Sequence, residues 1–136
     1  MTTRGMSPTT LSLRYLRADG WLVDVCERWI PAGPVGQVRK DLFGMLDLVA
    51  IRGTQTVGIQ TTSASNALAR LKKMTDPDHE PAARALIYAG WTLVVHGWRK
   101  STSDGRACNH GAAPCACRWT LHRNFVIDFR PREVSA

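Results

Sequence analysis

Two apolar segments joined by a short turn lie near the centre of the chain, and this pair constrains the fold more than any other feature. The first segment, Leu46 to Ile51, carries a single acid, Asp47, in an otherwise apolar run. The second, Thr56 to Thr62, ends in polar residues. Runs of this length and composition around a glycine-containing turn are typical of two adjacent β-strands. We therefore expect the chain to be organised around a β-sheet.

The alternation of side chains along the second strand predicts where a site could form. Successive side chains on a strand point to opposite faces, so Gln60 and Thr62 share one face while Val57 and Ile59 point to the other. An acid on one strand and a Gln-x-Thr sequence on its neighbour could then meet at one edge of the sheet. Such a group of oxygen-bearing side chains could hold a divalent cation.

Length and composition are those of one globular domain. The chain has 136 residues, 44% hydrophobic and 21% charged, which excludes a disordered chain and favours a single core. No apolar run approaches the roughly 20 residues needed to cross a bilayer. The N-terminus lacks the apolar core of a signal peptide, so we expect a cytoplasmic location. The net charge of +7 favours a polyanionic partner, nucleic acid before a membrane.

Local patterns place further elements on both sides of the strand pair. Ser7 and Pro8 predict a helix start, with Ser7 as the cap. Before the pair, we expect a helix, a strand, a loop and a basic connector at residues 9–18, 21–30, 31–36 and 37–41. After the pair, we expect two helices and two strands at residues 64–75, 82–89, 91–98 and 117–129. Glu27 falls near the end of the strand that precedes the loop.

This order of elements predicts an α/β fold with a mixed sheet flanked by helices. The helix over residues 64–75 would act as a crossover and place the following strand parallel to a central one. We expect a single domain over residues 1–136. Its parts would be a core, a Cys/His loop and a C-terminal strand at about residues 9–100, 101–117 and 118–129.

The element order and the central motifs resemble the PD-(D/E)XK nuclease superfamily. The segments GMLDLVAI and VGIQTTSASNALARLKK are similar to small phage-encoded, Holliday-junction-resolvase-like nucleases of that superfamily. The resemblance covers roughly Leu11 to Lys100 and does not include the cysteine segment. It implies a restriction-endonuclease-like fold with an αβββαβ core, and duplex or branched DNA as the partner. It also implies a location in the host cytoplasm, and it allows a homodimer with two sites on opposite strands.

The resemblance assigns roles to residues by position. Asp47 matches the motif aspartate, Gln60 the (D/E) position and Thr62 the lysine position, and Glu27 matches an accessory acid upstream. Mg²⁺ or Mn²⁺ would be the cofactor, because hydrolysis of a phosphodiester needs an ion that polarises the phosphate and activates water. Asp47, Glu27, the Gln60 carbonyl and a backbone oxygen near Thr61 could supply the hard oxygen ligands that Mg²⁺ prefers.

Two positions depart from the family pattern. Gln60 replaces a carboxylate, and Thr62 replaces the lysine expected beside the attacking water. Arg70 or Lys73 could supply that cation if the helix face that they share with Asn66 turns toward the strand ends. The sequence is compatible with a metal-dependent DNA endonuclease, of which a structure-selective enzyme is one form, or with a nuclease fold that binds DNA without cleaving it. A structural protein with an incidental basic surface is the third interpretation.

Several further residues have two interpretations each. The candidate contacts to nucleic acid are Arg39, Lys40, Asn66, Arg70 and Lys73, although Arg39 and Lys40 could equally be a solvated charge pair. Asp41 could be a further metal ligand, but a solvated turn residue is favoured. Trp29 could stack on a base, with core packing as the alternative. His96 lies in a predicted strand and is expected to be buried and hydrogen-bonded.

Three of the four cysteines lie close together near the C-terminal end. Cys108, His110, Cys115 and Cys117 have the spacing C-x-H-x4-C-x-C, and three thiolates with an imidazole could form a closed tetrahedral Zn²⁺ site. A hairpin tip with free thiols is the alternative. We expect a structural role, since four protein ligands leave no position open. The surrounding basic residues, which could contact phosphates, are Arg99, Lys100, Arg106, Arg118 and Arg123.

Overall fold

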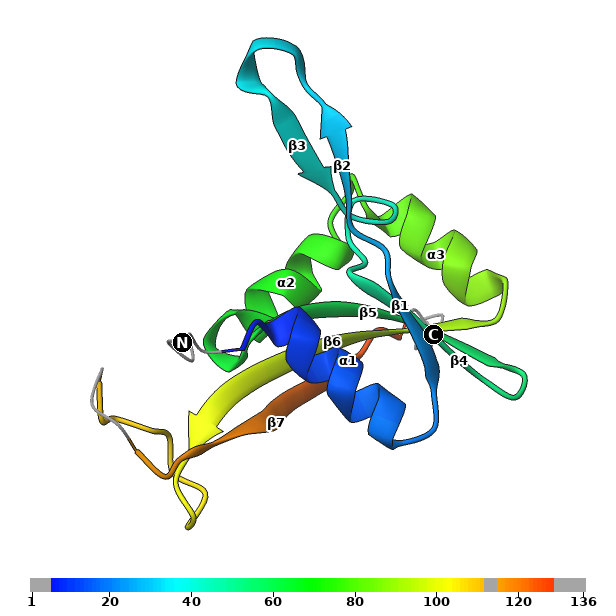
Figure 1. The fold of residues 1–136 in the computed structure, drawn as a ribbon. Helices are drawn as coiled ribbons and strands as arrows, with labels where there is room; N and C mark the ends of the chain where they lie inside the picture. Colours follow the sequence, from blue (N-terminus) through cyan, green and yellow to red (C-terminus); the bar gives the residue numbers. More distant parts are fainter. Residues whose placement is uncertain (1–5, 112–114, 129–136) are drawn as a thin grey trace, which may run out of the picture.

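The computed structural model describes residues 6–111 and 115–128. They form a mixed β-sheet with helices on both faces, and a separate two-stranded hairpin (Figure 1). The sheet has the order β1–β4–β5–β6–β7, with bounds Leu22–Val25, Leu48–Arg52, Gln55–Ser63, Trp91–Ser101 and Arg118–Val126. Strands β5 and β6 are parallel, and the other neighbouring pairs are antiparallel. The predicted α/β fold with a mixed sheet is confirmed, and so is the crossover between its two central strands.

Helices cover both faces of the sheet. They are α1 (Pro8–Ala18), α2 (Ala67–Met74) and α3 (Glu80–Tyr88). Leu16 of α1 shares one buried cluster with Val94 of β6, whereas Met74 of α2 shares the other with Val95. Neighbouring residues of β6 therefore enter opposite cores, as the two-residue repeat of a strand requires. The parity predicted for β5 is confirmed, because Val57 and Ile59 both belong to the cluster under α1.

The helix starts follow from local sequence. Ser7 is the cap of α1, as predicted, and its Oγ accepts a hydrogen bond from the Thr10 backbone N–H at 3.1 Å. The helix expected from residue 64 begins with a 3-10 turn, η2 (Ala64–Asn66), before α2. Gly97 of β6 allows this start to approach the sheet closely, because an added Cβ there would lie 2.9 Å from the Ala67 Cβ.

The strand predicted over residues 21–30 is wrong in one respect: it is two strands in different sheets. Strand β4 begins only at Leu48, so β1 loses its partner beyond Val25 and the chain leaves the sheet. It continues as β2 (Arg28–Pro31). A 3-10 turn, η1 (Gly33–Val35), and β3 (Gln37–Lys40) then follow where a loop and a connector were expected. Strands β2 and β3 form a hairpin that projects from the body of the molecule (Figure 1).

The C-terminal half follows the predicted order with small shifts. Helix α3 begins two residues earlier than expected and ends just before Gly90, whose φ of +97° suits glycine. Strand β6 is longer than predicted and reaches Ser101, and β7 ends at Val126. Phe129, the expected end of that last strand, lies outside the described residues. None of the described helices is long and apolar enough to cross a membrane.

Candidate functional site

Asp47 lies at the entrance to β4, held by both neighbouring segments. Its backbone N–H donates to the Ile59 carbonyl at 2.9 Å, and its own carbonyl accepts from the Cys26 N–H at 2.8 Å. The residue is only 2% exposed. Its Oδ2 accepts hydrogen bonds from Gln60 Nε2 (2.8 Å), the Thr61 N–H (2.8 Å) and Thr61 Oγ1 (3.1 Å). The carboxylate is therefore fixed by the strand that the sequence predicts beside it.

Burial raises the pKa of Asp47 from 3.8 to about 6, because a charged carboxylate loses solvation inside the protein. The hydrogen bonds from Thr61 act in the opposite direction and favour the ionised form. The nearby carboxylates of Asp41 and Glu27 raise the pKa further. A buried carboxylate beside two other acids is the kind of group that a bound cation stabilises in its charged form.

Three carboxylates come together here, and we call Glu27, Asp41 and Asp47 the acidic cluster. One oxygen from each residue lies within 4.8 Å of the others. Glu27 lies between β1 and β2, and the Thr9 hydroxyl donates to its Oε1 at 3.5 Å. The same Thr9 hydroxyl hydrogen-bonds to Thr61 Oγ1 at 2.8 Å. The start of α1 thus connects Glu27 to the residue that holds Asp47.

Asp41 was expected to be a solvated turn residue, but the structure places its carboxylate in the acidic cluster. A tight turn causes this: Leu42 and Leu46 form an antiparallel bridge, so the flanking residues Asp41 and Asp47 come next to each other. Gly44 lies inside the turn with a φ of +70°. The signal that could have found Asp41 is this Leu-x-Gly-x-Leu spacing, which closes a small loop between the two acids.

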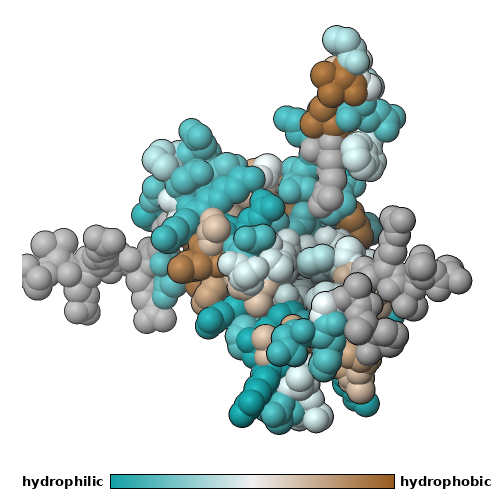
Figure 2. Space-filling view, turned by 90° about the vertical axis from the view of Figure 1, so that its left-hand side faces the viewer, coloured by the Kyte–Doolittle hydropathy of each residue, from teal (hydrophilic) through white to brown (hydrophobic). Residues whose placement is uncertain are grey.

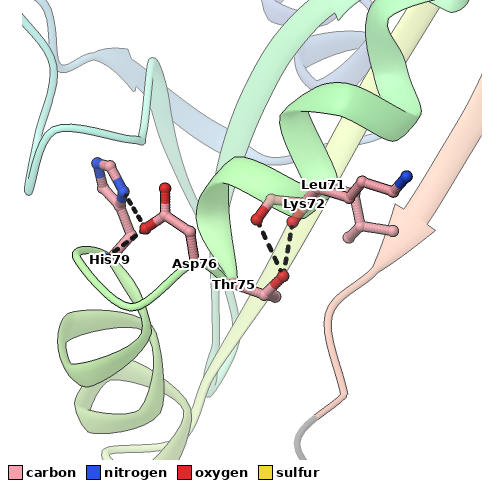
Figure 3. Close-up of polar contacts among 5 residues, drawn as sticks. All are labelled: Leu71, Lys72, Thr75, Asp76 and His79. Carbon is pink, nitrogen blue, oxygen red and sulfur yellow. Dashed lines mark hydrogen bonds and ion pairs between the residues drawn. The ribbon is translucent and has the colours of Figure 1, made fainter.

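The turn between α2 and α3 packs against the loop that joins Asp41 to Asp47. His79 Nδ1 lies 2.8 Å from Asp76 Oδ1, and the His79 backbone N–H donates to that oxygen at 2.9 Å (Figure 3). The His79 ring lies against Gly44, with Nε2 3.5 Å from where a Cβ would be. The hydrogen bond from His79 holds the pKa of Asp76 below its usual value. Helix α2 ends just before this pair, where Thr75 Oγ1 donates to the Leu71 and Lys72 carbonyls (Figure 3).

A pocket of about 300 Å³ opens beside Asp47. It is lined by Ser7, Pro8, Thr9, Asp41, Asp47, Gln60, Thr61 and Arg70. The first turn of α1 contributes the positive end of a helix dipole, which favours anionic groups. Arg70 contributes a full positive charge from α2. The pocket thus combines carboxylates that could hold a cation with donors that could bind a phosphate.

The predicted site residues divide between this pocket and its surroundings. Asp47 and Gln60 line it, and Glu27 joins Asp47 in the acidic cluster. Gln60 donates its amide to Asp47, so in this arrangement it positions the acid, and its amide oxygen remains the atom that could bind a metal. Thr62 is buried, and among the described residues the pocket lining includes Thr61 instead. Sequence reasoning overlooked the side-chain roles of Thr9 and Thr61.

The basic residues predicted to contact nucleic acid are also dispersed. Arg70 reaches the pocket, whereas Lys73 on the same helix is exposed and is not among the described lining residues. Asn66 is exposed at the end of η2. Lys40 is exposed at the end of β3, directly before Asp41. The backbone of Arg39 lies in β3, and its side chain lies outside the described part of the structure.

The Cys/His loop brings its four candidate ligands together between β6 and β7. The Sγ atoms of Cys108 and Cys115 are 3.7 Å apart, and His110 Nδ1 lies 3.2 Å from Cys108 Sγ and 3.4 Å from Cys117 Sγ. All four ligand atoms lie within 4.8 Å of one another. A tetrahedral zinc site has about 3.8 Å between sulfurs and about 3.6 Å between sulfur and nitrogen. The predicted cluster is therefore present and could bind a metal.

The pKa values of two thiols in this cluster are shifted in opposite directions. Hydrogen bonds from the His110 backbone and ring lower the pKa of Cys108 to about 6. Desolvation and the neighbouring thiols of Cys108 and Cys115 raise the pKa of Cys117 to about 12. Close packing of three sulfurs thus favours one thiolate at the expense of another, a conflict that a bound cation removes.

His96 is buried and hydrogen-bonded, as predicted. Its Nδ1 lies 2.9 Å from Ser12 Oγ, and Trp98 Nε1 donates to the same oxygen at 2.8 Å. Burial lowers the pKa of His96 to about 4, so the ring is neutral near pH 7. Tyr15 of α1 packs edge-on against both rings. These contacts attach α1 to β6 and give His96 a structural role in the strand beside Thr61, its cross-strand partner.

Comparison of the chain with protein-family models, with curated proteins and with solved structures gave no significant match.

Proposed function

We propose that the protein is a metal-dependent endonuclease that hydrolyses phosphodiester bonds of DNA, with a restriction-endonuclease-like arrangement of its sheet. The observation that carries the proposal is the acidic cluster beside the pocket that Arg70 and the start of α1 also line. A nuclease needs cation ligands and hydrogen-bond donors to phosphate around one reacting group. The net charge of +7 adds long-range attraction for a polyanion.

The acidic cluster suits a small hard cation. Mg²⁺ is bound by carboxylate oxygens, most often one or two, together with water and phosphate oxygens. Asp47 would be the central ligand, because three hydrogen bonds fix its position, and Glu27 and Asp41 offer oxygens on either side. When bound, the ion would polarise the phosphate and lower the pKa of an attacking water.

The chain's own residues would do the remaining work. Gln60 and Thr61 orient Asp47, and Thr9 orients Glu27. Arg70 would take the place of the family lysine, because it lines the pocket and carries a positive charge. It would bind a phosphate oxygen. A guanidinium is a poor proton acceptor, so water activation would depend on the cation.

The test compares wild-type protein and Asp47→Ala on branched and duplex DNA, with and without Mg²⁺ or Mn²⁺. We expect metal-dependent cleavage by the wild type, none by Asp47→Ala, and retained DNA binding by both. Thr62→Ala is the control, because Thr62 is a buried polar residue of the neighbouring strand β5 that is not among the described lining residues, and it should keep most of the activity. Binding that is salt-sensitive and unchanged in Asp47→Ala, with no cleavage of any substrate, would contradict the proposal and select the non-catalytic DNA-binding alternative.

We also propose that the Cys/His loop binds a structural Zn²⁺ ion. The separations of 3.7 Å between sulfurs and of 3.2 and 3.4 Å between sulfur and nitrogen support this, because they lie close to those across a tetrahedral site. Four protein ligands would close the site to substrate, so the ion would stabilise a loop. Metal analysis of purified protein should find one zinc per chain, and Cys115→Ser should lose it. Zinc-free wild type with three reactive thiols would contradict the proposal.

A further inference from the structure

The hairpin of residues 28–40 projects from the molecule, and we call it the projecting hairpin. Within the described part of the chain, its two strands pair with each other and with no other strand. Large apolar side chains are exposed on it: Trp29 is 63% exposed, Val35 78% and Val38 39%. The space-filling view shows apolar surface along this arm (Figure 2).

The projecting hairpin is expected to need a binding partner for its stability. A two-stranded hairpin is at best marginally stable by itself in water, and exposed tryptophan adds an unfavourable apolar surface. Tryptophan combines a flat face suited to stacking with a polar edge, which explains its frequent use in binding surfaces. The projecting hairpin is therefore better explained as a binding element than as part of the fold's support.

Charge identifies the chemistry of the partner. Residues 28–40 include three basic residues, Arg28, Arg39 and Lys40, and no acidic residue. A second copy of the same hairpin would bring like charges together, whereas a polyanion would neutralise them. Arg28 and Lys40 are cross-strand neighbours and share one face, and Trp29 points to the other face by strand alternation. The face with Arg28 and Lys40 can thus contact phosphates, while Trp29, the cross-strand neighbour of Arg39, presents an aromatic ring on the other.

The position of the hairpin relates it to the acidic cluster. Glu27 directly precedes β2, and Asp41 directly follows β3, so both ends of the hairpin connect to residues of the cluster. We propose that the projecting hairpin binds nucleic acid beside the acidic cluster, and that Trp29 stacks on an unpaired base. This rests on the proposed function for the identity of the polymer. It deepens that function by naming the substrate class as DNA with a single-stranded portion.

The test measures binding separately from cleavage. Affinities for a labelled single strand and for a blunt duplex of equal length are measured by fluorescence anisotropy without added Mg²⁺ or Mn²⁺. Stacking on one base accounts for about a 5- to 150-fold difference in affinity. We therefore expect Trp29→Ala to weaken single-strand binding by that factor and duplex binding much less. Trp29→Phe should keep most of the affinity.

Tyr88→Ala is the matched control, because Tyr88 is an aromatic residue on α3 that is 95% exposed. It should bind both ligands like the wild type. Equal single-strand affinities of Trp29→Ala and wild type would overturn the inference, and so would wild type that binds no single strand at moderate salt. A Trp29→Ala variant that changes from dimer to monomer in sedimentation with unchanged DNA affinity would assign the arm to a second copy and overturn it as well.

The two proposals fail in distinguishable ways. If Trp29→Ala binds single-stranded DNA like the wild type and metal-dependent cleavage is intact, only the inference about the hairpin is overturned. If the wild type cleaves no DNA but Trp29→Ala still weakens single-strand binding, only the nuclease proposal is overturned.

Discussion

Two buried titratable side chains, Asp47 and His96, meet the cost of burial in different ways. His96 stays neutral and shares the Ser12 hydroxyl with Trp98, so no buried charge arises near pH 7. Asp47 accepts three hydrogen bonds yet lies beside two further acids. Neutral burial is the usual arrangement of a structural residue, whereas clustered acids cost stability unless a cation or proton is present.

The first prediction concerns Asp41, the member of the acidic cluster that the sequence did not favour. Asp41→Asn removes one charged oxygen from the cluster, so we expect the apparent affinity for Mn²⁺ to fall by about 10-fold or more. The measurement is the cleavage rate as a function of Mn²⁺ concentration. Asp78→Asn is the control, since Asp78 is an exposed acid in the turn between α2 and α3. Equal metal dependence in both variants would exclude Asp41 as a ligand.

The second prediction concerns the pH dependence of stability. The folded-state pKa of His96 is about 4, below the ordinary value of 6.5, so protons bind the unfolded chain more tightly. The contribution of His96 is full above pH 6.5 and declines as the pH falls toward 4, by up to about 3 kcal/mol. His96→Gln removes this decline and keeps a polar group near Ser12.

Urea denaturation of both proteins between pH 7.5 and 4.5 checks this prediction. Asp47 acts in the opposite direction: its pKa is raised to about 6, so its ionisation cost disappears as the pH falls. The difference between wild type and His96→Gln cancels that contribution. We expect this difference to shrink on acidification, and parallel pH profiles would contradict the prediction.

At the scale of elements, the sequence predicts what depends on local pattern. Strands β4, β5 and β6 carry apolar runs that bury both faces, and the Ser7 cap marks α1. The projecting hairpin escapes prediction because cross-strand hydrogen bonds hold it together, and they leave no buried periodicity in the sequence. The position of Asp41 in the acidic cluster could not be predicted for a related reason. Its place beside Asp47 depends on the register of the Leu42–Leu46 bridge, which composition does not specify.

The third prediction concerns the Cys/His loop as an element. If zinc stabilises this loop, its removal by a chelator should expose the loop to trypsin, with cleavage after the exposed Arg106 at least about 10-fold faster. The sheet should stay folded without zinc, because the loop's cysteines belong to neither buried cluster. Cys115→Ser should show the fast cleavage without chelator, whereas Cys26→Ser, which changes the cysteine outside the loop, should resemble wild type.

At the scale of the whole molecule, the parallel pairing of β5 and β6 brings the two candidate sites to one end of the sheet. Gln60 and Thr61 lie near the C-terminal end of β5, and the Cys/His loop follows the C-terminal end of β6. Ligands of open α/β sheets bind at the carboxyl ends of the strands. One nucleic acid could therefore contact the acidic cluster and the cations around the loop together.

The last prediction tests that shared contact through salt dependence. Each phosphate neutralised on duplex DNA contributes about −0.9 to the slope of log affinity against log salt concentration. Arg118 and Arg123 are exposed on β7 next to the loop, so the double variant Arg118→Ala/Arg123→Ala should reduce the slope by up to about 2. Arg84→Ala is the control, because Arg84 Nε is paired with Glu80 Oε1 at 2.8 Å on α3. Duplex affinities at several salt concentrations, without Mg²⁺ or chelator, provide the slopes. Equal slopes in all three proteins would restrict DNA to the acidic cluster and the projecting hairpin, since only a contacted phosphate releases its counterions.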